Sequence, residues 1–497
     1  MLKRLFVLFL GLVLSFVCMT VAERDGDKLN SVISNNTTDE AGSGDDEMKV
    51  ELSDETLDIP DGVNYKDYVF TIFAPAPSGT NRYVREGING DPVNDAIYNR
   101  NLALRDELGV IIESKDFNTY TDKQAQKIID SVLAGDHAFD AAAIHSTSAC
   151  ASLIVADAVL SFDYLEYCDL SKPWWIQSFT ESCSMFDESF FTINSSCYGY
   201  YNMAACVLFN KDLAKEYDLP DFYELVRQGK WTIDKMIDVT KNFSEDLNGD
   251  GMYDYDDRLA VTCNDHSYLN FWYGAFRQST VVKGENDQPE YLVNTPRMSS
   301  VVAKLNALLN TGKRGAIYKM DAERQVYTDA FAEGKVLFHV ASASDAVALR
   351  AYDVNFGIIP LPKLDENQER YGSWVDPWHL AICVPVDNDN HERTGIILEA
   401  MAYYSYRMIY PALVEQTLFG SGTRDFESLE MLEDYIFPNV YFDYGFIYDG
   451  WGVGYSSLLR ILIPRGLTDI ASFAAARKNQ AEGHFQDLYD AALNNSN

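Results

Sequence analysis

The sequence predicts an α/β protein with two lobes, each built on a mostly parallel β-sheet flanked by helices. Two observations lead to this prediction. Apolar runs typical of buried strands alternate with amphipathic helical segments, which is the pattern of parallel strands connected by helices. The chain is also 497 residues long, which is more than a single hydrophobic core supports.

The first residues are typical of an export signal. A basic start, a short apolar core and small exit residues cover 1–22, and the apolar core is shorter than the about 20 residues that span a bilayer. We therefore expect a signal peptide over 1–22. A lipoprotein signal over 1–17, with a lipid on Cys18, remains an alternative, although large residues precede that cysteine. Either signal predicts an extracellular protein on the surface of a bacterium.

The next segment, 23–64, differs sharply in composition from the rest of the chain. It carries 13 acidic residues, 3 basic residues and no aromatic residue. Such a segment cannot bury enough apolar surface to offset the entropy of ordering. We expect a disordered acidic tether, and the folded part should start at Tyr65.

Charge and cysteine usage exclude some classes of function. The net charge of −35 argues against nucleic-acid binding, because contacts to phosphates need clustered Lys and Arg. The cysteines after Cys18 are odd in number and include no CxxC pair. They therefore predict neither a zinc site nor a disulfide framework, and we expect small buried residues.

The first lobe should begin with strand, helix and strand. YVFTIFA (68–74) is typical of a buried strand, and Val110 opens a second one after a helix. For that helix Asp91 is the expected N-cap, with Pro92 in the first turn, and Gly109 should end it.

A second helix and a third strand should follow. Thr121 and Gln124 have the spacing of a capping box at the start of the helix, and Gly135 should end it. The third strand is expected over 139–144.

A second unit with the same alternation is predicted further along the chain. AACVLFN (204–210) is typical of a strand, and Thr232 should cap a later helix. KVLFHVAS, VNFGIIPLP and WHLAICVPV are three more expected strands. The last hundred residues or so are mainly helical in pattern.

Several phrases in this order resemble one family. VLFNKDLAKEYDLPDFYELVRQGKWTIDKM, FAEGKVLFHVAS, VNFGIIPLPK and YGSWVDPWHLAICVPV are similar to segments of bacterial extracellular solute-binding proteins of carbohydrate ABC importers, a family that includes maltose-binding proteins. The resemblance implies a periplasmic-binding-protein-like fold, with a ligand cleft at a hinge of a few crossing strands. The domain limits that it implies are 65–200 and 379–445 for lobe 1, 201–378 for lobe 2, and 446–497 for C-terminal helices on lobe 2.

Candidate ligand-binding residues follow from strand ends and from exposed-looking aromatic residues. In open α/β sheets, ligands bind beyond the carboxyl ends of the strands. Sugars pack against flat aromatic faces and are oriented by a few polar groups. Many of the aromatic residues should nevertheless be core. The candidates are His145, Ser146, Tyr200, Tyr201, Trp272, Tyr273, Trp374, Asp376, Trp378 and Trp451.

The stretch DLNGDGMYDYDD has the spacing of a calcium loop. Positions 1, 3, 5, 7, 9 and 12 are filled by Asp246, Asn248, Asp250, Met252 through its carbonyl, Asp254 and Asp257. The final Asp is shorter than the usual bidentate Glu, and a strand rather than a second helix is expected after the loop. We expect a structural Ca²⁺ site rather than a sensor, with a solvated acidic turn as the alternative.

Three function classes remain open from the sequence, and one of them, a surface adhesion or scaffold module, lacks the expected repeats and type of anchor. The first is a monomeric binding protein that captures a carbohydrate and hands it to the permease subunits of an ABC transporter. The alternative is a secreted carbohydrate-active enzyme, a glycoside hydrolase or lyase, which needs a pair of carboxylates across the scissile bond. With 75 Asp and Glu in the chain, such a pair cannot be nominated from sequence, and no HExxH or GxSxG motif occurs.

Overall fold

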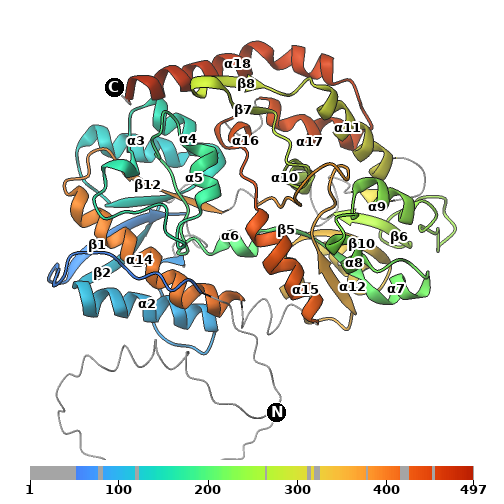
Figure 1. Ribbon diagram of the computed structural model, residues 1–497, viewed down its shortest axis with the longest axis horizontal. Coiled ribbons are helices and arrows are strands. Elements are labelled where there is room, and N and C mark those ends of the chain that lie inside the picture. The colour runs from blue at the N-terminus through green and yellow to red at the C-terminus, as the bar shows by residue number, and fades with distance from the viewer. Residues whose placement is uncertain are drawn as a thin grey trace, which may run out of the picture. The chain divides into compact units, whose positions relative to one another are not determined.

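The computed structural model (Figure 1) describes residues 52–75, 82–117, 123–263, 266–310, 315–317, 325–375, 379–414, 425–449 and 454–495. The expected signal peptide over 1–22, with Cys18, lies outside these residues, as does the first part of the expected tether. Among the described residues, no helix combines the length and the apolar character that a bilayer crossing requires.

The first sheet has five strands, in the order β2-β1-β3-β12-β4. β1 pairs in parallel with β2 and β3, whereas β12 runs antiparallel to β3 and β4. The strands are β1 (Tyr68–Ala74), β2 (Val110–Asp116), β3 (Ala141–His145), β4 (Val159–Leu160) and β12 (Leu380–Pro385). The strands predicted at 68–74, at Val110 and at 139–144 are thus confirmed.

The helices around this sheet are α2 (Pro92–Leu108), α3 (Gln124–Ala134), α4 (Ser146–Val155), α5 (Gln177–Cys183) and α14 (His391–Pro411). α2 begins and ends as predicted: the Asp91 carboxylate accepts a hydrogen bond from the Asn94 amide, and Gly109 adopts the left-handed conformation, with φ of 63°. α14 lies beside α2 (Figure 1).

The capping box predicted for α3 is wrong. Lys123 is the N-cap, without a side-chain hydrogen bond, while Thr121 lies outside the described residues. The Gln124 side chain is buried and its Oε1 accepts a hydrogen bond of 3.0 Å from the His145 amide. Gln124 therefore satisfies a backbone donor at the end of β3 instead of one at the start of its own helix.

The second sheet also has five strands, in the order β11-β5-β10-β6-β9. β5 runs antiparallel to β11 and β10, whereas β6 is parallel to β10 and β9. The strands are β5 (Ala205–Asn210), β6 (Leu259–Cys263), β9 (Gly315–Ile317), β10 (Val336–Ser342) and β11 (Phe356–Ile359). The hairpin strands β7 (Val281–Lys283) and β8 (Pro289–Tyr291) pair only with each other among the described strands.

The remaining helices are mostly short. Those that precede β12 are α6 (Gly199–Asn202), α7 (Lys211–Glu216), α8 (Phe222–Arg227), α9 (Ile233–Thr240), α10 (Phe271–Ala275), α11 (Pro296–Leu309), α12 (Gln325–Ala332) and α13 (Ala343–Leu349). Those near the C-terminus are α15 (Phe426–Glu430), α16 (Tyr444–Tyr448), α17 (Leu458–Leu462) and α18 (Ile470–Asn495). The predicted cap of α9 is confirmed, because Thr232 Oγ1 accepts a hydrogen bond from the Lys235 amide.

Each sheet contains one strand that runs against all its neighbours, and the chain reaches it by crossing from the other lobe. β5 follows the first-lobe elements, and β12 follows the second-lobe strand β11. Three segments lie at the crossing between the lobes and are numbered in chain order: the first includes 204–205, the second 372–375 and the third 439–441. They are hydrogen-bonded to one another: the Ala205 amide donates to Trp374 O (2.8 Å), and the Tyr441 amide donates to Ser373 O (2.8 Å). This is the hinge of a few crossing strands that the resemblance implied.

Part of the expected acidic tether is attached to the first lobe. The Ser53 amide donates to the Tyr406 hydroxyl at 3.0 Å, and Lys172 Nζ pairs with the Glu55 carboxylate at 2.8 Å. The prediction of disorder is therefore wrong for 52–64. Composition showed that this segment cannot form a core, but not that a neighbouring helix offers it polar partners.

The expected domain limits need two adjustments. α15 lies on the second sheet rather than on lobe 1, since Ser428 Oγ accepts from the Ile358 amide of β11 at 2.9 Å. α18, expected on lobe 2, also reaches the first lobe: it contacts α4, and Asn495 Nδ2 donates to Ile154 O at 2.9 Å.

Candidate functional site

The carboxyl ends of strands from both sheets lie beside the crossing segments. β3 ends at His145 opposite Leu380, where β12 begins, and β10 ends at Ser342 opposite Ala205, where β5 begins. Loops that follow such strand ends are where open α/β sheets bind ligands. The hinge region is therefore the place to look for a site.

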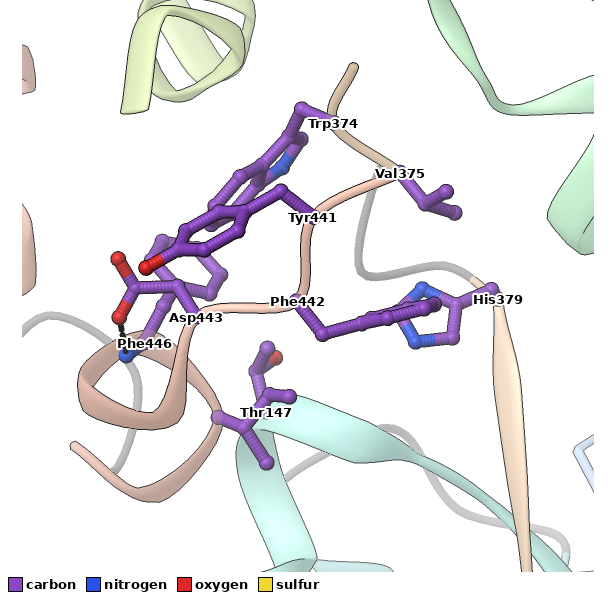
Figure 2. A pocket seen from close by; sticks show the side chains of 9 residues that line it. Thr147, Trp374, Val375, His379, Tyr441, Phe442, Asp443 and Phe446 are labelled. Atoms are coloured by element: carbon purple, nitrogen blue, oxygen red, sulfur yellow. Dashed lines mark hydrogen bonds between the residues drawn. The ribbon is translucent and has the colours of Figure 1, made fainter. Parts of the chain in front are cut away.

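A small pocket lies there (Figure 2). Its volume is about 10 Å³, which is room for about one water molecule. The lining residues come from the end of the first sheet, from the second crossing and from the third crossing with α16. They are Thr147, Trp374, Val375, His379, Tyr441, Phe442, Asp443, Phe446 and Ile447.

Trp374 is the aromatic residue that borders this pocket from the crossing. Its side chain is 3% exposed, and its ring packs edge-on against Phe446 with ring centroids 4.9 Å apart. The indole Nε1 is buried and has no hydrogen-bond partner among the described residues. Leaving a buried donor unpaired costs about 1–3 kcal/mol, so this N–H is a natural place for an acceptor on a bound molecule.

Asp443 is the carboxylate of the pocket. It is 2% exposed, and its Oδ1 accepts a hydrogen bond of 2.9 Å from the Phe446 amide at the start of α16 (Figure 2). Burial, together with the nearby Asp449, raises the pKa of Asp443 to about 7, although the hydrogen bonds from Phe446 and Ser279 oppose the shift. No sequence pattern distinguishes Asp443 from other acidic residues, because an acidic N-cap is common in so acidic a chain.

We expect Asp443 to make the folded state less stable at high pH. Its pKa is 3.8 in an unperturbed chain and about 7 in the fold, so its stabilising contribution is complete below about pH 4 and is lost as the pH rises through about 7. Urea unfolding at pH 5 and pH 8 should show this loss, and Asp443→Asn should reduce the difference by ~2 kcal/mol. Asp106→Asn, at an exposed position on α2, is the control, and an unchanged pH difference in Asp443→Asn would contradict the assignment.

Two more of the predicted candidates, His145 and Ser146, lie close to the pocket, and Ser146 contacts His379, which lines it. Ser146 Oγ and His379 Nε2 are 3.1 Å apart, and both residues are buried. His145 is buried at the end of β3, where its amide donates to Gln124. The pocket itself is lined by the next residue, Thr147. The prediction from strand ends therefore identified the segment that borders the pocket, but the lining residue is Thr147 rather than His145 or Ser146.

The other described candidates have packing roles in this structure. Trp272 and Tyr273 lie on α10 in the interior of the second lobe, and the Tyr273 hydroxyl donates to Ser456 O at 3.2 Å. Tyr200 and Tyr201 are buried on α6 with their rings at right angles. Trp374 is therefore the one described aromatic candidate that lines the pocket; Asp376, Trp378 and Trp451 lie outside the described residues.

The predicted calcium loop brings three of its carboxylates together. Oxygens of Asp246, Asp250 and Asp257 lie within 4.8 Å of one another. Asp257, at position 12, is fully buried and accepts hydrogen bonds from the Leu247 and Asp254 amides. The strand β6 follows the loop, as expected. An all-oxygen set of this kind suits a hard cation such as Ca²⁺.

The two remaining side-chain positions of the loop are engaged locally. Asn248 Oδ1 accepts from the Asp250 amide, and Asp254 Oδ1 accepts from the Asp256 amide. Met252, at position 7, is exposed. Asp246 and Asp250 also accept hydrogen bonds from amides of the loop, but only positions 1, 5 and 12 form the cluster of converging carboxylates among the described residues.

Comparison with known proteins gave structural likeness without sequence relatives. No family model matches the chain, and no curated protein sequence does. The galacto-N-biose-/lacto-N-biose I-binding protein of an ABC transporter from Bifidobacterium longum, in complex with lacto-N-biose, aligns over 85% of this chain and 99% of its own, with a TM-score of 0.56 and 12% identity.

Two other solved structures are similar to the same extent. An ABC transporter solute-binding protein from Agrobacterium radiobacter K84 in complex with ribitol covers 84% of this chain and 99% of its own (TM-score 0.52, 9% identity). A cyclo/maltodextrin-binding protein complexed with maltotetraose covers 86% and 96% (TM-score 0.51, 12% identity). The chain therefore has the two-lobed fold of the solute-binding proteins of ABC transporters.

Proposed function

We propose that this protein captures a carbohydrate at the hinge between its lobes and delivers it to the permease of an ABC importer. The observation that carries the proposal is the buried, unpartnered Nε1 of Trp374 at the hinge. A sugar hydroxyl is an acceptor that suits it, and the Asp443 carboxylate is a second polar group in the same pocket. The fold supports the proposal, since the similar structures were solved with lacto-N-biose, ribitol and maltotetraose.

The crossing segments supply the mechanism. Trp374 and Tyr441 belong to two different crossings, and Ser373 O accepts from the Tyr441 amide. A ligand that contacts both crossings as well as Thr147 would bind one arrangement of the lobes better than another. Binding energy would then shift the hinge equilibrium towards the closed form, which is the form that a permease would recognise.

A titration with glycans tests the proposal against the enzyme alternative. The chain without residues 1–22 is mixed with pooled oligosaccharides, and tryptophan emission is followed as a function of concentration. A saturable change with the sugar recovered intact supports binding and transport. A cleaved product would support a hydrolase or lyase, and no response to any glycan would overturn the proposed ligand class.

We also propose that the loop over 246–257 holds a structural Ca²⁺. Calcium at about 100 times its dissociation constant should stabilise the fold by about 2.7 kcal/mol, which calorimetry measures as a higher Tm. Asp250→Asn should abolish the increase because it removes one of the three converging carboxylates. Asp256→Asn, at the exposed position 11, should retain it. An equal increase in both variants would contradict the site.

Export and anchoring complete the proposal. We expect a monomer on the outer surface of a bacterium, processed after Ala22 or lipidated on Cys18. The mass of the mature chain from its native host distinguishes the two, because a lipid on Cys18 adds acyl chains, whereas processing after Ala22 removes that cysteine.

A further inference from the structure

A buried arginine, Arg82, lies in the first lobe, in the segment between β1 and α2. Arg82 is 6% exposed, and its Nη1 is buried with no hydrogen-bond partner in the part of the chain that the structure describes. Its guanidinium lies flat against Gly199: a Cβ on Gly199 would come within 2.7 Å of Arg82 Cζ. The glycine therefore creates the space that the guanidinium occupies, and the Tyr198 ring lies beneath the charge, 5.9 Å from Cζ.

Two more arginines near this segment also lack a counter-charge. Arg85 has a buried Nε that no described residue hydrogen-bonds. Arg100 is fully buried and donates to neutral oxygens, those of Ser405, Asn101 and the Tyr83 carbonyl. Within the described part of the chain, no ion pair involves any of these three arginines. Burial lowers the pKa of Arg100 to about 10, so the Arg100 guanidinium remains cationic at neutral pH.

This absence is informative because the chain is so acidic. It has 75 Asp and Glu against 40 Lys and Arg, so a counter-charge would be easy to supply. Burying a charge without a counter-charge costs free energy of folding, and a bound anion would offset this cost. Guanidinium groups bind carboxylate, sulfate and phosphate oxygens through paired, charge-assisted hydrogen bonds.

The position of Arg82 connects it to the proposed ligand site. It follows β1, whose carboxyl end lies on the same edge of the sheet as that of β3. Its contact, Gly199, begins α6, the helix that leads into the first crossing. That crossing pairs with the second one at Ala204 and Val375, and Val375 lines the pocket.

We propose that the carbohydrate taken by this protein is anionic, and that Arg82 binds its charged group. The inference rests on the proposed function and narrows it to acidic sugars. Gly199 keeps the guanidinium plane in place, and Tyr198 supports it from below. Trp374 and Asp443 would contact the uncharged part of the same ligand.

The decisive measurement compares matched sugars on the unaltered protein without residues 1–22. Oligosaccharides that end in glucuronic acid are titrated by calorimetry beside the same oligosaccharides with the carboxyl reduced to the alcohol. We expect the acid to bind about 10-fold tighter or more. Sulfated and phosphorylated sugars, inorganic sulfate and inorganic phosphate are parallel probes that identify which anion is preferred.

Variants then test the assignment to Arg82. Arg82→Gln should bring the affinity for the acidic sugar down to that for its neutral partner, and Gly199→Ala should do the same by displacing the guanidinium without removing its charge. Arg105→Gln removes an equal charge from an exposed position on α2 (side chain 57% exposed) and should leave the ratio unchanged.

The possible outcomes separate this inference from the proposed function. Neutral sugars that bind as tightly as acidic ones would overturn the anionic ligand but leave carbohydrate binding intact. If inorganic sulfate or phosphate binds but no sugar does, both the anionic carbohydrate and carbohydrate binding itself are overturned. If Arg82→Gln does not fold, the ratio measured on the unaltered protein and on Gly199→Ala still decides the question.

Discussion

Gly372→Ala is expected to destabilise the protein by ~3 kcal/mol, the upper end of what overpacking usually costs. A Cβ at position 372 would lie 2.0 Å from Gly274 O and 3.0 Å from Arg277 Cγ. Gly274 in turn would place a Cβ 2.7 Å from Ser373 O. The clash is therefore between two backbones, the crossing segment and α10, and no side-chain rotation relieves it. Urea unfolding followed by far-UV circular dichroism measures the loss.

The matched control is Gly483→Ala. Gly483 lies inside α18, and a Cβ there would meet nothing within 4 Å. Since glycine inside a helix costs up to about 1 kcal/mol relative to alanine, this variant should be more stable than the parent. If Gly372→Ala were as stable as the parent, α10 and the second crossing would not be in direct backbone contact.

This contact also bears on how the hinge moves. Ser373 is hydrogen-bonded on both sides: its amide donates to Asn439 O (3.0 Å) and its Oγ donates to Ala205 O (2.9 Å). It therefore belongs to a unit of three crossings that α10 touches through Gly274. We expect α10 to move with the second crossing, so that rotation of the lobes occurs in residues on either side of Ser373.

Much of this fold could be predicted from local sequence patterns. Strands such as β1 and β5 are continuous apolar runs bounded by polar residues, and helices such as α2 and α9 carry their caps at the expected positions. These features depend on neighbours in the chain, which is why periodicity and capping chemistry find them. The reversed direction of β12 and β5 was not predicted, because strand direction is set by a crossing from the other lobe.

The site was harder to predict because its residues act through distant neighbours. Trp374 stood out as a tryptophan beside the expected crossing, but Trp272 has a similar sequence context and lies in the interior of the second lobe. Asp443 and Arg82 carried no sequence signal at all. Both residues are distinguished by their buried surroundings. Burial raises the pKa of the Asp443 carboxyl, and Arg82 forms no ion pair with any described residue. Gln124 shows the same limit, since its partner, His145, is 21 residues away.

Trp374→Phe is expected to weaken ligand binding about 10-fold or more while changing the stability of the free protein little. The phenyl ring retains the contact with Phe446 but removes an N–H that has no partner in the free protein. Loss of an unpaired donor costs the folded state nothing in hydrogen bonding, although the smaller ring leaves some space unfilled. The affinity falls because the ligand's acceptor loses its donor. Titration of tryptophan emission gives the affinity, and urea unfolding gives the stability.

Trp231→Phe provides the opposite case. Trp231 is also fully buried, but its Nε1 donates to Pro360 O at 2.9 Å, so the substitution leaves a buried carbonyl unpaired at a cost of about 1–3 kcal/mol. Since Trp231 does not line the pocket, the variant should be less stable and bind with unchanged affinity. The two variants therefore distinguish an indole N–H that binds a ligand, in Trp374, from an indole N–H that stabilises the fold, in Trp231. If Trp374→Phe binds every glycan as well as the parent does, the unpaired indole is not part of the recognition site, and the hinge pocket loses its main support as the place where the sugar binds.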